Sequence, residues 1–168
     1  EITAIPTLLE VLELKGCIVS MDAMGCQRKI AETIIGKGAD YILAVKGNQG
    51  FLLDDIKEAF AQDKPQSEDV QTNLGHGRIE KRSCRVIQNT EWICKKEEWE
   101  GLNSLVEVCA ERTNKATGEQ QKEVRYYISS LQADAASLNR HIRSHWGIEN
   151  HLHWTLDVVF HEDQSLKR

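Results

Sequence analysis

Two acidic residues stand in sequence contexts where a carboxylate is costly unless it serves a purpose. Asp22 directly follows the apolar run CIVSM, and Glu149 lies inside IRSHWGIENHLHWTLD (142–157), which is otherwise rich in tryptophan, histidine and aliphatic side chains. On a helix that turns about 100° per residue, Glu149 shares one stripe with Ile142 and His145. A buried, unpaired carboxylate costs several kcal/mol, so we expect it to be protonated, paired or bound to a cation.

A divalent cation is the usual reason for two acids to be held close together, because it removes their mutual repulsion. Oxygen ligands suit Mg²⁺ or Mn²⁺, which support phosphodiester chemistry by activating a water or a hydroxyl and stabilising the leaving oxygen. We therefore predict that Asp22 and Glu149 meet and hold such a metal. Simpler explanations stay open: Asp22 caps a turn before Gly25, and Glu149 pairs with Arg140 or Arg143.

Basic residues are candidates for contacts with phosphate groups. The run RIEKRSCR (78–85) contains four, and alternation along a strand puts Lys81 and Arg85 on one face and Arg78 and Arg82 on the other. This two-sided ribbon fits a solvated strand and a phosphate-binding strand equally well. The formal net charge of -5 argues against a general electrostatic grip on nucleic acid, so any such contact must come from local patches.

The elements that must position Asp22 are predicted from the first part of the chain. Residues 16–22 are typical of a short buried strand, residues 26–35 of a helix that ends at a glycine turn, and residues 40–48 of a second buried strand. A strand, a helix and a strand with short connections favour a parallel pair. Because ligands gather beyond the carboxyl ends of such strands, Asp22 is well placed for chemistry.

The remaining chain changes character twice. A helix is expected at 49–62, followed by a polar break at 63–69 and then by segments rich in β-branched and aromatic residues. We divide the chain into 1–69, the first part of an α/β core; 70–131, a β-rich antiparallel insertion outside the parallel core; and 132–168, a helical part that carries Glu149. The predicted class is α/β.

Composition excludes several kinds of protein. No apolar run is long enough to cross a bilayer and no signal peptide is present, so we expect an intracellular, cytoplasmic protein. The five cysteines include no C-x-x-C pair, and we expect them to be buried and reduced. The sequence contains no Walker A, dinucleotide or G-x-S-x-G motif, so neither a nucleotide cofactor nor a nucleophilic serine is predicted.

Three long segments in the right order carry a family resemblance: VSMDAMGCQRKIAETIIGKGADYILAVKGNQ, GHGRIEKR and IRSHWGIENHLHWTLDVVFHED. They resemble the insertion-sequence transposases of the H-repeat-associated type, which are DDE transposases with a ribonuclease-H-like core. The resemblance implies a metal-dependent enzyme that cuts and joins DNA, with the ends of the mobile element as its partner. Three acids hold two Mg²⁺ (or Mn²⁺) ions in this family. Asp22 matches the second acid and Glu149 the third.

The surroundings of the third acid depart from the family pattern. Related transposases have Y-(2)-R-(3)-E-(6)-K there, and the corresponding residues here are Ile142, His145, Glu149 and Leu156. Only the acid is shared, and a histidine replaces the arginine. Contacts with DNA are therefore expected from other residues as well, and the set that we predict is Lys81, Arg82, Arg85, Arg143 and His145.

The first acid of the family has no counterpart in these 168 residues. The resemblance thus implies the later part of a catalytic domain, without its first strands, and we expect this chain alone to be inactive. Loss of neighbouring strands exposes a sheet edge, which favours a homodimer. The alternative is a non-catalytic remnant of a transposase that only folds or binds a partner.

Overall fold

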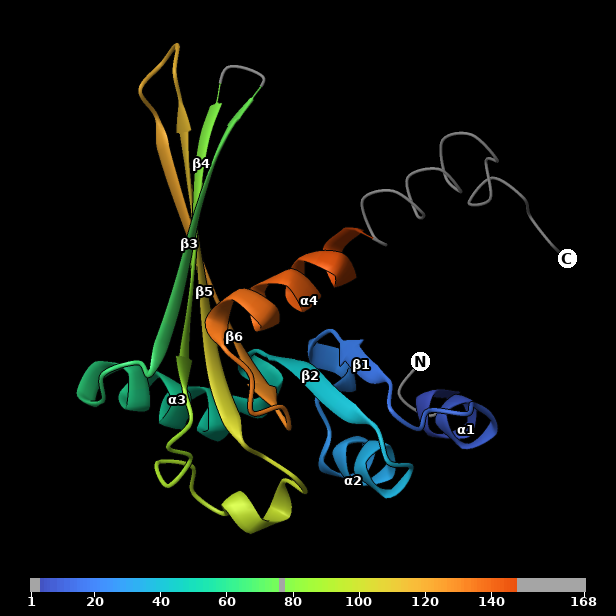
Figure 1. The fold of residues 1–168 in the computed structure, drawn as a ribbon. Helices are drawn as coiled ribbons and strands as arrows, with labels where there is room; N and C mark the ends of the chain where they lie inside the picture. The colour runs from blue at the N-terminus through green and yellow to red at the C-terminus, as the bar shows by residue number, and fades with distance from the viewer. Residues whose placement is uncertain (1–3, 76–77, 148–168) are drawn as a thin grey trace, which may run out of the picture.

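The computed structural model describes residues 4–75 and 78–147, and in these residues it contains one six-stranded sheet with helices packed on it (Figure 1). The strand order is β1-β2-β6-β5-β4-β3. Along the chain the elements are α1 (Ala4–Val11), β1 (Ile18–Met21), η1 (Ala23–Gly25), α2 (Arg28–Gly36), β2 (Asp40–Val45), η2 (Gly47–Gln49), α3 (Gly50–Gln62), β3 (Ser67–Gly75), β4 (Arg78–Ile87), η3 (Lys96–Glu98), β5 (Ser104–Asn114), β6 (Gln120–Ser129) and α4 (Ala135–Gly147).

The predicted parallel pair is present. Strands β1 and β2 pair in parallel from Ile18 opposite Asp40 to Met21 opposite Leu43, and α2 connects them. The α/β class is therefore confirmed. Strand β1 is less buried than expected, because it forms one edge of the sheet and Ile18 is 37% exposed.

The four remaining strands are antiparallel, as expected, but they do not lie outside the parallel core. Strand β6 pairs with β2, from Ile42 opposite Ser129 to Val45 opposite Tyr126, so the sheet is continuous. Strand β2 ends at Val45, whereas β6 and its neighbours extend far beyond this point. We call the sheet of β3, β4, β5 and β6 the arm, and Figure 1 shows it projecting from the rest of the molecule.

Strand β3 begins three residues before the predicted β-rich part, because Ser67–Asp69 fall in the expected polar break. The apolar residues of its sequence, SEDVQTNLG, are Val70 and Leu74, and both are exposed. The side chains that turn toward α4 are polar and find polar partners there: Asn139 donates a hydrogen bond to Asp69 at 2.7 Å, and Arg143 donates one to Gln71 at 3.4 Å. Because these partners are distant in sequence, the local pattern does not reveal what the polar face of the strand packs against.

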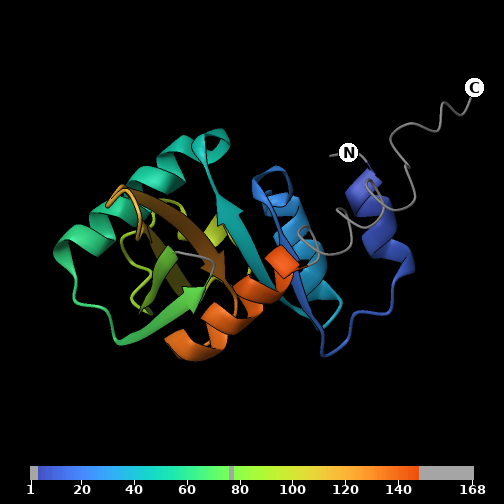
Figure 2. The same cartoon turned by 90° about the horizontal axis from the view of Figure 1, so that it is seen from above.

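Helices cover both faces of the sheet (Figure 2). On one face α1, α2 and α3 pack through residues such as Leu9, Ile34 and Ile56. On the other face α4 packs through Ala135, Leu138 and Ile142 against a smaller cluster of strand residues. Helix α4 begins where expected, because the Asp134 carboxylate accepts a hydrogen bond from the Ser137 amide at 2.7 Å. No helix in the described ranges is both long and apolar enough to cross a bilayer.

The cysteines are only partly as expected. All five are free thiols, and Cys26, Cys84 and Cys109 are buried, but Cys17 and Cys94 are exposed. Burial raises the pKa of the Cys26 thiol and that of the Cys84 thiol to about 12, so both stay protonated at neutral pH. These two therefore behave as small apolar core residues rather than as reactive groups.

The packing of α4 leads to a stability prediction. Leu138 is 0% exposed and Leu8, on α1, is 55% exposed. Leu138→Ala leaves a cavity and is expected to lower the free energy of unfolding by about 2–5 kcal/mol. Leu8→Ala, the same substitution on a helix surface, should change it by about 0.5 kcal/mol or less. Urea unfolding of both variants checks this, and similar losses in the two would contradict the assignment of α4 to the core.

Candidate functional site

Asp22 lies directly after the carboxyl end of β1, as the sequence predicts. Its Oδ1 accepts a hydrogen bond from the Met24 amide at 3.1 Å and so caps the short helix η1. Asp22 therefore has the capping role that the sequence analysis gave as the alternative to metal binding. It occupies one oxygen of an exposed carboxylate, so a ligand role for the other oxygen is compatible with it.

The turn after Asp22 requires glycine. A Cβ atom at Gly25 would lie 2.7 Å from Cβ and Sδ of Met21, closer than such atoms approach in proteins. The short helix η2, which follows β2, also holds the turn: Asn48 donates a hydrogen bond to the Ala23 carbonyl at 2.6 Å, and Gln49 donates one to the Cys26 carbonyl at 2.9 Å. These two amides were not singled out from the sequence. Their signal was the polar segment KGNQG immediately after β2.

Helix α4 is tied to the strand that ends at Asp22. The Oγ of Ser20 lies 3.0 Å from Nδ1 of His145, a hydrogen bond that joins β1 to the last turns of α4. Ile142, one turn earlier, is buried against the sheet, which agrees with the stripe expected for this segment. The same stripe predicts Glu149, which lies outside the described residues.

A pocket of about 340 Å³ opens where β2 ends and β6 continues into the arm. Asp22 lines it, together with His145 from α4 and Lys46, which follows β2. This is the carboxyl end of the parallel strands, where ligands bind in open α/β sheets. The structure therefore brings Asp22 and His145 to one cavity.

One wall of this pocket is a stack of an arginine on a tryptophan. The guanidinium carbon of Arg125 lies 3.8 Å from the centre of the Trp146 ring, a cation–π contact. Arg125 also donates a hydrogen bond to Glu123 at 2.7 Å, and this bond lowers the pKa of the Glu123 carboxyl. Trp146 in turn donates to the Tyr127 hydroxyl at 3.4 Å. The end of α4 is thus anchored to β6 as well as to β1.

Comparison with known proteins identifies the family. The family model described as "Transposase DDE domain" matches residues 1–168. The chain belongs to the DDE transposase domain family.

This DDE domain is also similar in sequence to curated proteins that are named as transposases. It is 45% identical over 172 residues to "Putative transposase YncI" of Escherichia coli O157:H7, which covers 98% of this chain and 44% of that protein. It is also 45% identical over 172 residues to "H repeat-associated putative transposase YhhI" of Escherichia coli strain K12, covering 97% of this chain and 45% of that protein. The chain therefore spans less than half the length of these relatives. No solved structure matches it.

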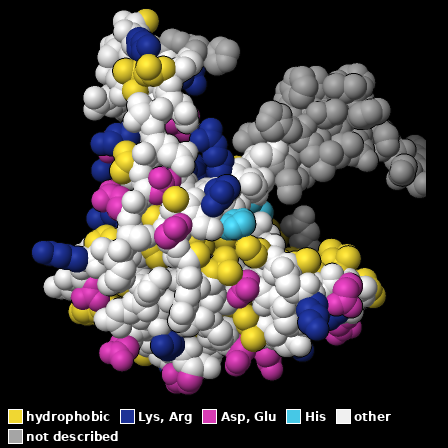
Figure 3. Space-filling view, viewed as in Figure 1, with side chains coloured by type: hydrophobic (Ala, Val, Ile, Leu, Met, Phe, Trp, Pro, Cys, Tyr) yellow, Lys and Arg dark blue, Asp and Glu magenta, His cyan; other side chains and the backbone are white. Residues whose placement is uncertain are grey.

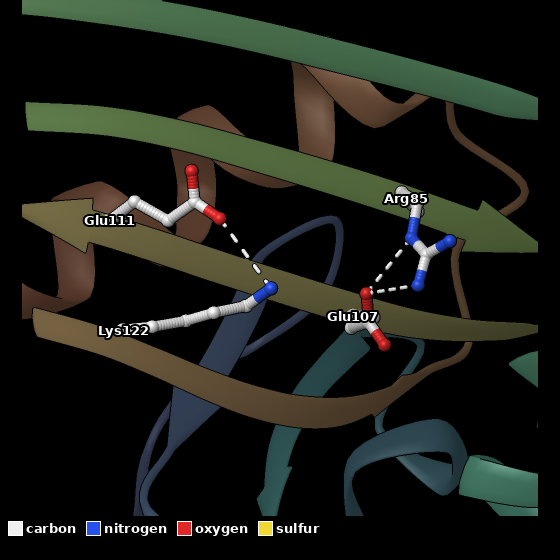
Figure 4. Close-up of polar contacts among 4 residues, drawn as sticks. All are labelled: Arg85, Glu107, Glu111 and Lys122. Atoms are coloured by element: carbon white, nitrogen blue, oxygen red, sulfur yellow. Dashed lines mark hydrogen bonds and ion pairs between the residues drawn. The ribbon is translucent and has the colours of Figure 1, made fainter.

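The predicted DNA-binding residues of the DDE domain have different surroundings. Arg82 donates a hydrogen bond to Asn139 of α4 at 2.8 Å, and burial lowers the pKa of its guanidinium. Arg85 lies on the opposite face of β4, over the ring of Phe60 at 5.4 Å. Its Nε donates to Glu107 at 2.8 Å (Figure 4). The predicted alternation along this strand is confirmed.

The three other residues predicted to contact DNA, Lys81, Arg143 and His145, also lie on different parts of the molecule. Lys81 is exposed on the Arg85 side of the arm, away from α4. Arg143 is exposed on α4, and His145 alone among the five lines the pocket with Asp22. Within residues 4–75 and 78–147 no group of three His, Cys, Asp or Glu side chains is placed to hold a metal ion. Of the predicted site residues, the described part of the DDE domain therefore brings Asp22 and His145 to the pocket.

The link between Ser20 and His145 can be measured with a double-mutant cycle. Ser20→Ala and His145→Ala remove one partner each, and the coupling between them should be about 0.5–1.5 kcal/mol in urea unfolding, because they share one hydrogen bond. The cycle of Ser20→Ala with Ser144→Ala is the control, since Ser144 bonds only to the Arg140 carbonyl among the described residues. Equal coupling in both cycles would refute a specific contact between β1 and α4.

Proposed function

We propose that this DDE domain supplies two acids, Asp22 and Glu149, to a metal-dependent centre that cuts and joins DNA in the complete transposase. The observation that carries the proposal is the hydrogen bond between Ser20 and His145. It fixes the helix that leads toward Glu149 beside the strand that ends at Asp22. Glu149 itself lies outside the described residues, and its place beside Asp22 is part of the proposal.

The donors available suit a hard divalent cation. The Oδ2 of Asp22 makes no hydrogen bond or ion pair within the described residues, and the side chain is exposed beside the pocket. Carboxylate oxygens are the ligands that Mg²⁺ and Mn²⁺ prefer. When bound, such an ion supplies activation of the attacking oxygen and stabilisation of the leaving oxygen.

The residues of the chain act by holding and orienting. The Met24 amide fixes one oxygen of Asp22, and the contact of His145 with Ser20 aligns α4 on β1. Lys46 lines the same pocket and places positive charge where a phosphate group of DNA would lie. His145, in the place of the family's arginine, thus supports the site through Ser20.

The first acid of the family is proposed to come from a strand that pairs with the free edge of β1. That edge has no partner strand in the described part of the chain. Apolar side chains nearby are also exposed, notably Leu8, Val11 and Leu12 of the α1 region. Such a surface beside an open edge is suited to further strands and their covering chain.

Binding of Mn²⁺ tests the pair of acids. We expect the 168-residue chain to bind Mn²⁺ weakly, and Asp22→Ala and Glu149→Ala each to weaken binding about tenfold or more, because each removes a charged ligand. Asp54→Ala is the control, since Asp54 is an exposed acid on α3. The titration is followed by electron paramagnetic resonance of free Mn²⁺. Equal affinities in all three variants would overturn the shared site.

Strand cleavage gives a second test. With two of the three acids, the chain is expected neither to nick nor to join duplex DNA in Mg²⁺ or Mn²⁺, because two-metal chemistry needs ligands on both ions. Cleavage of a labelled duplex is measured beside the full-length relative YhhI. Metal-dependent cutting that disappears in both Asp22→Ala and Glu149→Ala would contradict this expectation and show that the chain completes its own site.

A further inference from the structure

The two faces of the arm differ in charge. Side chains alternate along each strand, so the register assigns every residue to the face covered by α4 or to the face covered by α3. We call these the α4 face and the α3 face. The arm carries many Lys and Arg side chains (Figure 3), and the sequence alone distributes those of β4 equally over both faces.

Acids cancel the basic residues on the α3 face. Arg85 donates hydrogen bonds to the Glu107 carboxylate, and the Nζ of Lys122 lies 3.4 Å from Oε1 of Glu111 in an ion pair (Figure 4). Lys81 stands directly opposite the same Glu111 in the register. With α3 included, the described residues of this face carry four basic and six acidic side chains: Lys57, Lys81, Arg85 and Lys122 against Asp54, Asp55, Glu58, Glu68, Glu107 and Glu111.

The α4 face has the opposite balance. With α4 and the residue before β6 included, its described residues carry six arginines and four acids: Arg78, Arg82, Arg112, Arg125, Arg140 and Arg143 against Asp69, Glu80, Glu119 and Glu123. Helix α4 itself contains no acidic residue. A net positive face is therefore built into a chain whose formal net charge is -5.

Four of these six arginines are available to a ligand. Arg82 is bonded to Asn139, and Arg125 is held by Glu123 and Trp146. In contrast, the side chains of Arg78 and Arg140 make no hydrogen bond or ion pair within the described residues. Arg143 and Arg112 make only long contacts, at 3.4 Å to Gln71 and 3.8 Å to Glu80.

Three neighbouring hollows join these arginines into one track. A hollow of about 480 Å³ beside α4 is lined by Arg140 and Arg143, and one of about 570 Å³ by Arg143 and Arg78. A third, of about 120 Å³, is lined by Arg78 and Arg112. Shared arginines make the hollows contiguous from α4 toward the end of the arm. Amide side chains line them as well, namely Gln71, Asn73, Asn114, Asn139 and Gln121, and one acid lines each of the last two hollows, Glu80 and Glu119.

We propose that the α4 face of the arm binds the phosphate backbone of duplex DNA through Arg78, Arg112, Arg140 and Arg143, and that the α3 face takes no part. Arginines flanked by amides are the side chains that contact phosphates independently of base sequence. A polyanion with many condensed counterions fits a row of arginines that have few or only long contacts better than a compact ligand does. This inference rests on the proposed function, which makes DNA the partner, and adds the surface that holds it.

The test compares two double variants that remove the same charge. Arg78→Gln with Arg143→Gln changes the α4 face, and Lys81→Gln with Lys122→Gln changes the α3 face. Binding of a fluorescent duplex of arbitrary sequence to the 168-residue chain is measured by anisotropy over a salt series, in EDTA. The arginine pair should weaken binding about tenfold or more at low salt and lower the salt slope by about two. The lysine pair should change affinity less than about twofold.

The outcomes are decisive in both directions. Arg78→Lys with Arg143→Lys keeps the charge and should restore affinity to within about threefold, which excludes a folding defect as the cause. Equal weakening by the two Gln pairs, or no binding by the unsubstituted chain at low salt, would overturn the proposal. Because metal is absent, such a failure is separate from a failure of the Asp22 and Glu149 pair, which the Mn²⁺ titration detects independently.

Discussion

The whole structure depends on β2 being hydrogen-bonded along both of its edges. On one side it pairs in parallel with β1, and on the other it pairs antiparallel with β6. Serine side chains reinforce the second junction: Ser129 donates to the Tyr41 carbonyl at 2.8 Å, and the Tyr41 amide donates to Ser130 at 2.9 Å. Because β2 joins the part that carries Asp22 to the part that carries the arm, a change in its register would displace one relative to the other.

The difference in length between β2 and β6 creates the candidate site. Strand β2 ends at Val45, while β6 begins beyond it at Gln120, so the sheet narrows abruptly at this point. The end of α4 closes the resulting notch from one side, with Trp146 against Tyr127 and His145 against Ser20. A pocket forms because backbone pairing stops there, and the nearby turn brings Asp22 to its rim.

Local patterns in the sequence predicted much of this fold and less of the site. Apolar runs and glycine turns were sufficient for β1, α2, β2 and α3, and α4 lies in the part from residue 132 that was expected to be helical. The start of β3 was missed because its side chains toward α4 are polar and pair with that distant helix. The continuity of the sheet was missed because the pairing of β6 with β2 leaves no mark in either segment alone.

Electrostatic partners were hidden for the same reason. Alternation placed Lys81 and Arg85 together correctly, but only the register shows that Glu111 and Glu107 stand opposite them on β5. Similarly, His145 was known only as a substitute for an arginine, and its contact with Ser20 depends on how α4 crosses the sheet. The position of Glu149 in space stays a prediction, because it lies outside the described residues.

The two edge strands of the sheet, β3 and β1, differ in how readily a further strand can pair with them. Strand β3 carries Glu68 and Asp69 and is polar along nearly its whole length, which discourages another strand from adding to it. Strand β1 contains no charged residue from Ile18 to Met21 and leaves its outer edge uncapped within the described chain. A strand of a newly synthesised or unfolded chain would therefore pair with β1 rather than with β3. The edge that can accept a correct partner strand is thus also the edge at which incorrect pairing and aggregation would begin.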